Sequence, residues 1–114
     1  MSSFTAKSKF NKYATISGNT PDVYAVALQI DCRNSIGSSL ILWNNGGGSL
    51  DVQIATKMDA AASIEYSELD TTTIVPTGTV RYFEKDTLGT ILVYIRASVA
   101  GIPANYTIEY IVER

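Results

Sequence analysis

Histidine is absent from this 114-residue chain, and cysteine occurs only once, at Cys32. Without histidine, neither a Ser-His-Asp triad nor a Cys-His pair can form. A single cysteine excludes a disulfide within the chain, and the lack of histidine removes structural zinc sites of the Cys/His type. The fold therefore has to be stabilised by packing and hydrogen bonds.

Charge is also scarce, with 18% charged residues and a formal net charge of −2. A net negative charge gives no indication of a nucleic-acid-binding surface, because phosphate binding needs clustered Lys and Arg. No apolar run approaches the ~20 residues of a membrane helix. The opening stretch MSSFTAKSKF has no apolar signal-peptide core. We therefore expect no nucleic acid or membrane as partner and no secretion signal.

What the chain does have is a series of short segments with strand character. Apolar and polar residues alternate with a period of two, most clearly in residues 23–32, 50–57, 79–85, 90–98 and 105–114. Turns rich in Gly, Asn and Pro separate them, and no segment has the length of a useful helix. About seven or eight such strands predict an all-β fold, a single antiparallel β-sandwich with Ig-like or jelly-roll topology.

The first twelve residues differ from the rest. They are small and polar, with three lysines and with Phe4 and Phe10 as the sizeable apolar residues besides the initial Met. We predict a flexible N-terminal arm over residues 1–12 and the sandwich domain over residues 13–114. The two phenylalanines would serve as anchors on a partner, and the lysines would suit an acidic surface.

The organising stretch is LILWNNGGGSLDVQIATK, residues 40–57. It predicts two strands joined as a hairpin by an Asn/Gly turn. Residues 40–43 do not alternate, so this strand should be covered on both faces. In residues 23–32, the expected core side consists of Tyr24, Val26, Leu28, Ile30 and Cys32.

Several apolar residues occupy the phase of their strand that should face water. Such residues predict a second apolar patch, which on a soluble protein marks an interaction site. We therefore expect self-association, for example as a trimer, or docking on a protein lattice. The predicted contact residues, with the two arm anchors included, are Phe4, Phe10, Trp43, Phe83, Leu92, Tyr94 and Ile111.

Carboxylates are the only acid-base groups available for catalysis, namely Glu65 with Glu68 and Asp51 with Asp59. A two-carboxylate glycosidase needs a cleft and a raised pKa on one acid. Asp51 and Glu65 lie at the polar phase of their strands, which predicts solvent exposure and an ordinary pKa. We expect no catalytic residues.

No metal or cofactor is expected either. Asn44, Asn45 and Asp51, or Asp31 with Asn34, could offer oxygens to calcium, but no Asp-rich calcium loop is present. Turn chemistry explains the same asparagines.

A carbohydrate- or ligand-binding β-sandwich module is the alternative function. An exposed Trp43 together with tyrosines could form a sugar-stacking platform. Most tyrosines are in phase with apolar neighbours, which favours core or interface. The sequon at residues 105–107 is read as chance, since no secretion signal accompanies it.

The pattern resembles the small β-sandwich virion proteins of tailed bacteriophages, over residues 38–114. The pieces that carry the resemblance are LWNNGG at 42–47, LDVQI at 50–54, PTG at 76–78, the strand at 91–96 and GIPA at 101–104. The resemblance implies a head decoration, head-fibre or tail accessory protein without an active site. It implies a non-enzymatic virion component made in the host cytoplasm, whose N-terminal arm suits docking on a capsid or tail lattice.

Overall fold

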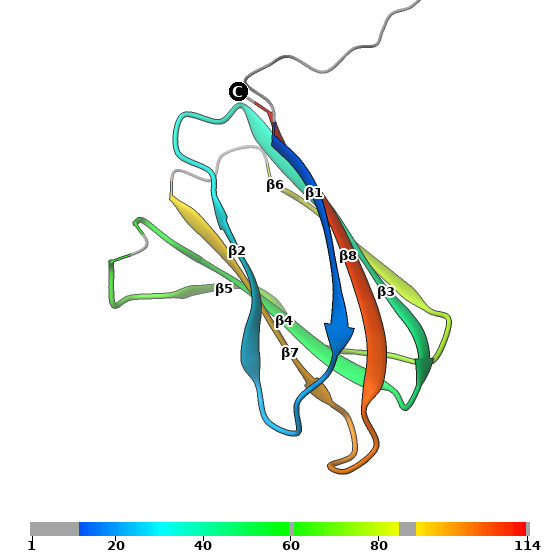
Figure 1. Cartoon of the computed structure of the whole chain (residues 1–114). Coiled ribbons are helices and arrows are strands. Elements are labelled where there is room, and N and C mark those ends of the chain that lie inside the picture. The colour runs from blue at the N-terminus through cyan, green and yellow to red at the C-terminus, as the bar shows by residue number, and fades with distance from the viewer. Residues whose placement is uncertain (1–11, 60, 85–88, 114) are drawn as a thin grey trace, which may run out of the picture.

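Eight strands arranged in two sheets make up the computed structural model, which describes residues 12–59, 61–84 and 89–113. The strands are β1 (Lys12–Asn19), β2 (Ala25–Asp31), β3 (Gly37–Gly47), β4 (Leu50–Lys57), β5 (Tyr66–Ile74), β6 (Thr79–Glu84), β7 (Thr90–Ala97) and β8 (Ala104–Glu113). One sheet has the order β1-β8-β3-β6, the other β2-β7-β4-β5 (Figure 1). All pairings are antiparallel. The β-sandwich prediction is confirmed, and the strand order is that of a jelly roll.

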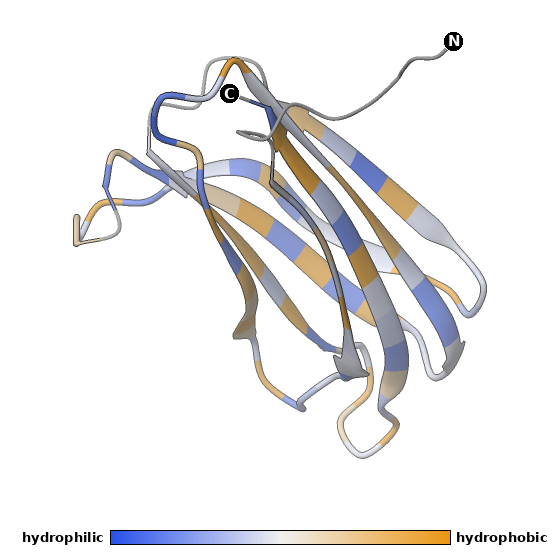
Figure 2. Ribbon diagram, turned by 45° about the horizontal axis from the view of Figure 1, so that its top comes forward, coloured by the Kyte–Doolittle hydropathy of each residue, from blue (hydrophilic) through white to orange (hydrophobic). Residues whose placement is uncertain are grey.

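The core lies between the two sheets, where every second residue of most strands points inward. Figure 2 shows the resulting alternation of hydrophobic and hydrophilic residues along the strands. Leu42, Leu50, Ile54 and Ile108 are fully buried there. None of the described residues belongs to a helix long and apolar enough to cross a membrane.

The predicted hairpin over residues 40–57 is wrong, because its two strands belong to different sheets. β3 pairs with β6 and β8, whereas β4 pairs with β5 and β7. The glycine turn therefore carries the chain from one sheet to the other. A Cβ on Gly47 would lie 2.6 Å from the carbonyl oxygen of Pro103, and one on Gly48 would lie 2.5 Å from that of Ile102. The glycines thus allow the β7–β8 connection to pack against this turn.

The central strand β3 is buried on one face only, which corrects the expectation that both faces are covered. Leu40 and Leu42 face the core and are 2% and 0% exposed. Ile41 and Trp43 lie on the outer face and are half-buried. Their hydrophobicity therefore does not serve the core of this chain.

A β-bulge corrects the predicted core face of β2. The pairing with β7 shifts between Val26 and Leu28, so the alternation changes phase there. Leu28, Ile30 and Cys32 are buried as expected, but Val26 is 48% exposed. Tyr24 lies on the outer side with it and is half-buried.

The connection between β4 and β5 projects from the body of the sandwich (Figure 1). Residues 63–67 alternate in polarity, which would place Ile64 and Tyr66 on an inward face, but these two residues are 63% and 55% exposed. An alternating pattern buries one face only where another layer covers it, and this end of the sheet extends past the opposite one.

Candidate interaction surface

The outer face of the β1-β8-β3-β6 sheet carries a group of outward apolar side chains on paired strands. The strand register places these side chains in rows. One row contains Tyr13, Ile111, Ser39 and Phe83, the next contains Thr15, Glu109, Ile41 and Arg81, and the third contains Ser17, Thr107, Trp43 and Thr79. Apolar residues of neighbouring rows thus lie side by side or diagonally across adjacent strands.

Five of these side chains form what we call the outer patch: Tyr13, Ile41, Trp43, Phe83 and Ile111. Ile41 is its centre, because it lies diagonally between Ile111 and Phe83 and two residues from Trp43 on β3. Phe83 is 67% exposed and Tyr13 48%; the other three are half-buried. A contiguous patch of this kind is typical of a surface that binds another protein.

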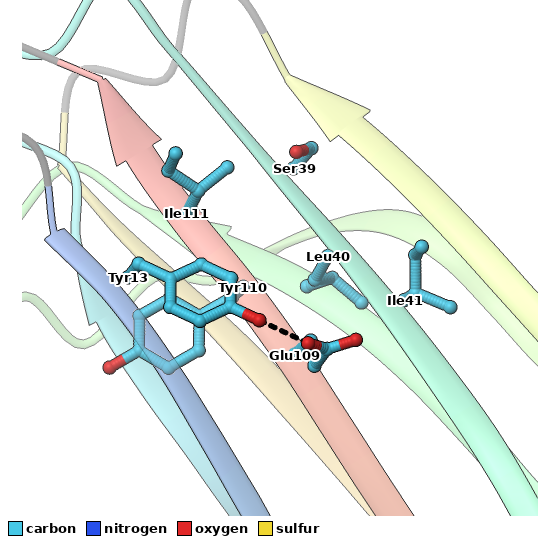
Figure 3. Close-up of a pocket in the computed structure, with 7 residues that line it drawn as sticks. All are labelled: Tyr13, Ser39, Leu40, Ile41, Glu109, Tyr110 and Ile111. Atoms are coloured by element: carbon cyan, nitrogen blue, oxygen red, sulfur yellow. Dashed lines mark hydrogen bonds between the residues drawn. The ribbon is translucent and has the colours of Figure 1, made fainter. Parts of the chain in front are cut away.

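A shallow pocket of about 310 Å³ lies within the outer patch (Figure 3). Tyr13, Ile41 and Ile111 supply apolar walls, and Ser39 and Glu109 supply polar groups. The Tyr13 hydroxyl donates a hydrogen bond to the Glu109 carboxylate. This bond raises the pKa of the Tyr13 phenol above its usual value.

Three of the predicted contact residues, Trp43, Phe83 and Ile111, therefore share one face. Tyr13 and Ile41 also belong to that face, although they were not among the predicted contact residues. Ile41 could have been predicted from the sequence, because it lies two residues before Trp43 and so faces the same side of the strand. Tyr13 gave none, because its position beside Ile111 depends on the pairing of β1 with β8. Phe4 and Phe10 lie outside the described residues.

The two remaining predicted residues, Leu92 and Tyr94, lie on the opposite sheet. Leu92 is 3% exposed and its neighbour Ala55 is 8% exposed, so Leu92 does not contribute to the molecular surface. The Tyr94 hydroxyl donates to Glu65 at 2.8 Å. Glu65 immediately precedes β5, in which Ser67 pairs with Ala55, and Ala55 pairs with Leu92 on its other side. The Tyr94 side chain therefore extends along the outer face toward the row that contains Leu92.

Asp51 is the centre of a polar cluster on this second outer face. Its carboxylate accepts hydrogen bonds from Ser98 at 2.7 Å, from Thr73 at 2.8 Å and from Nε of Arg96 at 3.0 Å. Asp51 is only 6% exposed, which corrects the expected solvent exposure. Burial acts to raise its pKa, but the three hydrogen bonds and the charge of Arg96 outweigh burial, and the pKa is lowered.

Tyr24 closes this cluster from above. The Arg96 guanidinium carbon lies 4.3 Å from the centroid of the Tyr24 ring, a cation-π contact. The Tyr24 hydroxyl reaches Thr71 of β5 at 3.0 Å. Because Tyr24 precedes β2, this side chain spans the sheet from one edge strand to the other. We call Tyr24, Asp51, Thr71, Thr73, Arg96 and Ser98 the polar clasp.

The other candidate residues serve local structure. Asn44 is buried, and its side-chain amide donates to the carbonyl oxygens of Gly48 and Ile74 at 2.9 Å each. Among the described residues, no group of three His, Cys, Asp or Glu side chains could hold a metal ion. Glu68 accepts a hydrogen bond from Thr56 at 3.1 Å, and Asp59 lies 3.8 Å from Arg33.

A second pocket, of about 230 Å³, lies beside that ion pair. Gln29, Asp31, Arg33, Asp59 and Thr90 line it. The Arg33 guanidinium bonds Asp31 at 3.0 and 2.8 Å, so its charge is directed to that neighbouring carboxylate. Glu65 and Glu68 do not line this pocket, and the paired carboxylates considered for catalysis are therefore not brought together in it.

Comparison with known proteins extends only to the fold. No protein-family model matches the chain, and no curated protein matches it by sequence. Among solved structures, a subunit of Bacillus endospore appendages, described as a novel family of disulfide-linked pili, is similar with a TM-score of 0.59 and 11% identity. The match covers 99% of this chain and 97% of the pilus subunit.

PirA is similar with a TM-score of 0.55 and 16% identity, over 95% of this chain and 99% of that one. The infectious bursal disease virus structure, Gx strain, matches with a TM-score of 0.40 and 14% identity, over 93% of this chain and 33% of that one, which is too distant to support an argument. The first two similarities show that the jelly-roll sandwich is shared along nearly the whole chain.

Proposed function

We propose that this chain is a non-enzymatic structural subunit that assembles with copies of itself, and that the outer patch is its contact surface. The observation that carries the proposal is the difference between the two outer faces. On the second face Leu92 is buried and polar groups surround Asp51, with Val26 exposed on the edge strand β2, whereas the outer patch gathers aromatic and aliphatic groups on paired strands of the first sheet. Burial of such groups between copies is the main source of stability in protein interfaces.

Two further facts support an assembly role. A protein of nearly the same length and fold is the subunit of a pilus. The resemblance of residues 38–114 to small virion proteins of tailed phages supports a place in a virion, as a head decoration or tail accessory protein. In a virion, the outer patch would contact a second copy or the capsid or tail lattice.

The proposed contact is non-covalent. Cys32 is the only cysteine of the sequence, and it is fully buried in the core. It therefore offers no thiol at the surface for a disulfide between copies. In this respect the proposed assembly differs from the disulfide-linked pili.

Native mass, measured by sedimentation over a wide range of protein concentrations, tests the proposal. We expect a discrete oligomer, whose dissociation constant rises about tenfold or more when Phe83 is replaced by Ser. Ile64→Ser is the matched control, because Ile64 has nearly the same exposure as Phe83, 63% against 67%, and lies on the projecting β4–β5 connection. A monomer at every concentration, or equal effects of the two variants, would contradict this function.

A further inference from the structure

The pocket in the outer patch has apolar walls and a carboxylate, which together suit an aromatic side chain with a positively charged residue beside it. Its walls are the Tyr13 ring and the aliphatic groups of Ile41 and Ile111. At about 310 Å³ it is at the small end of binding pockets. The Glu109 carboxylate at its rim accepts one hydrogen bond from Tyr13, and a carboxylate can accept several.

The charge around the pocket is mainly negative. Glu113 lies on the same face of β8 as Glu109 and Ile111, because the three residues alternate along one strand. Arg81 is the positive residue of the described rows. It lies on β6, two strands from Glu109, a separation of roughly 10 Å. A cationic ligand would therefore be attracted to the β1–β8 side of the pocket.

The chain itself contains a segment of matching chemistry. Residues 1–11 read MSSFTAKSKFN, with Phe4 and Phe10 as aromatic residues and with Lys7 and Lys9 as cations. Lys12 is the first residue of β1 and pairs with Val112, next to the Tyr13–Ile111 pair at the pocket. The segment thus joins the sandwich at the pocket. An extended stretch of eleven residues reaches about 36 Å, which is enough to reach an adjoining copy.

We propose that residues 1–11 of one copy dock into the pocket of a second copy, with a phenylalanine between Tyr13, Ile41 and Ile111 and the lysines beside Glu109 and Glu113. Docking within one copy is disfavoured for Phe10. Lys12 is still paired in β1, so only Asn11 would remain to reverse the chain.

This inference rests on the proposed function, and it assigns the occupant of the contact surface. Two full-length variants test it. Phe4→Ser/Phe10→Ser keeps the pocket and removes both anchors, whereas Ile111→Asp keeps the anchors and spoils the pocket. Thermal unfolding of each variant verifies that the sandwich is intact.

We expect each variant alone to self-associate about thirtyfold more weakly than the wild type, as for the loss of a buried aromatic anchor. An equimolar mixture should form a two-chain complex, because the segment of Ile111→Asp can occupy the pocket of the other variant. Sedimentation with one variant carrying a fluorescent label measures that complex.

The possible failures are distinguishable. If Phe4→Ser/Phe10→Ser assembles like the wild type while Phe83→Ser does not, the proposed function stands and this inference is overturned. If both variants are weak and their mixture forms no complex, docking between copies is also overturned. A wild type that stays monomeric overturns both.

Charge reversal gives a second test, because the salt dependence of self-association should change only if the lysines of one copy lie beside the carboxylates of another. Glu109→Lys/Glu113→Lys should weaken self-association about tenfold at low salt, and less at high salt. Lys7→Glu/Lys9→Glu in the same chain should restore most of the loss. A combined variant as weak as the first would overturn the pairing of these lysines with these carboxylates.

Discussion

The two outer faces of this sandwich use similar residues in opposite ways. On the β2-β7-β4-β5 sheet, aromatic rings lie across the strands and join polar groups, as Tyr24 does over Arg96. On the β1-β8-β3-β6 sheet, aromatic and aliphatic groups remain exposed on neighbouring strands, as Phe83 and Tyr13 do. An apolar residue at a strand position that should face water can be covered by side chains of its own chain, or it can stay exposed for a partner to cover. Which of the two occurs depends on whether a neighbouring side chain is long enough to lie over it.

Exchange of a buried residue on the closed face is expected to give the largest effect. Leu92→Ala should lower the free energy of unfolding by about 3 kcal/mol, because Leu92 is 3% exposed. Ile111→Ala on the open face should cost less than about 1.5 kcal/mol and weaken self-association instead. Urea unfolding and sedimentation measure the two quantities. Equal stability losses would remove the distinction between the faces.

The polar clasp gives the next effect. Asp51→Asn removes the charge that Arg96 and two hydroxyl groups surround, and should cost about 2 kcal/mol of stability. Asp59→Asn is the matched control, since Asp59 is an exposed partner of Arg33, and should change stability by less than about 0.5 kcal/mol. If Asp51→Asn lowers the unfolding free energy no more than Asp59→Asn does, the polar clasp does not stabilise this face.

Acid should weaken the same cluster. The folded-state pKa of Asp51 is lowered below its ordinary value, so its contribution is fully present above about pH 4 and is lost as the pH falls through the folded-state pKa. The difference in unfolding free energy between the wild type and Asp51→Asn should therefore narrow as the pH falls below about 4. A difference that stays constant over this range would show that Asp51 keeps its ordinary pKa.

Single hydroxyl groups give a smaller effect. Tyr24→Phe removes the hydrogen bond to Thr71 but keeps the ring on Arg96, and should cost about 1 kcal/mol. Tyr13→Phe removes the bond to Glu109 on the open face and should cost less, because solvent replaces it. Thermal unfolding of the two variants in parallel shows which one loses more stability. A larger loss for Tyr13→Phe than for Tyr24→Phe would contradict the role of Tyr24 in covering the second face.

Addition of a reductant should have no effect. With Cys32 in the core, the native mass should be equal in the presence and absence of dithiothreitol. Dissociation by the reductant would mean that a thiol contact links the copies.

The strands, their alternation and the sandwich could be predicted, because a period of two is a local property of the sequence. The partner of each strand could not. Asn and Gly at residues 44–48 correctly indicate a reversal, but the register alone shows that β3 and β4 lie in different sheets. The bulge between Val26 and Leu28 likewise depends on pairing with β7, and it moves Tyr24 from the expected core to the outer face.

The candidate surface was predictable only in part, for the same reason. Phase alone marks Trp43, Phe83, Ile111, Leu92 and Tyr94 as unusual, but it cannot tell which sheet each occupies. Asp51 was expected in solvent because its phase is polar. It is buried because Ser98, Thr73 and Arg96 meet it from other segments of the chain.

The pairing of β1 with β8 has a consequence for the time course of synthesis. Ser17 of β1 meets Thr107 of β8 across 90 residues of chain. At about 5–20 residues per second, a ribosome needs roughly 5–20 seconds to make that stretch. Throughout this interval β1 has no edge to join, and β3 lacks the neighbour that separates it from β1. The first sheet is therefore completed only after translation has passed β8, and until then β1 cannot form its pairing in the sheet.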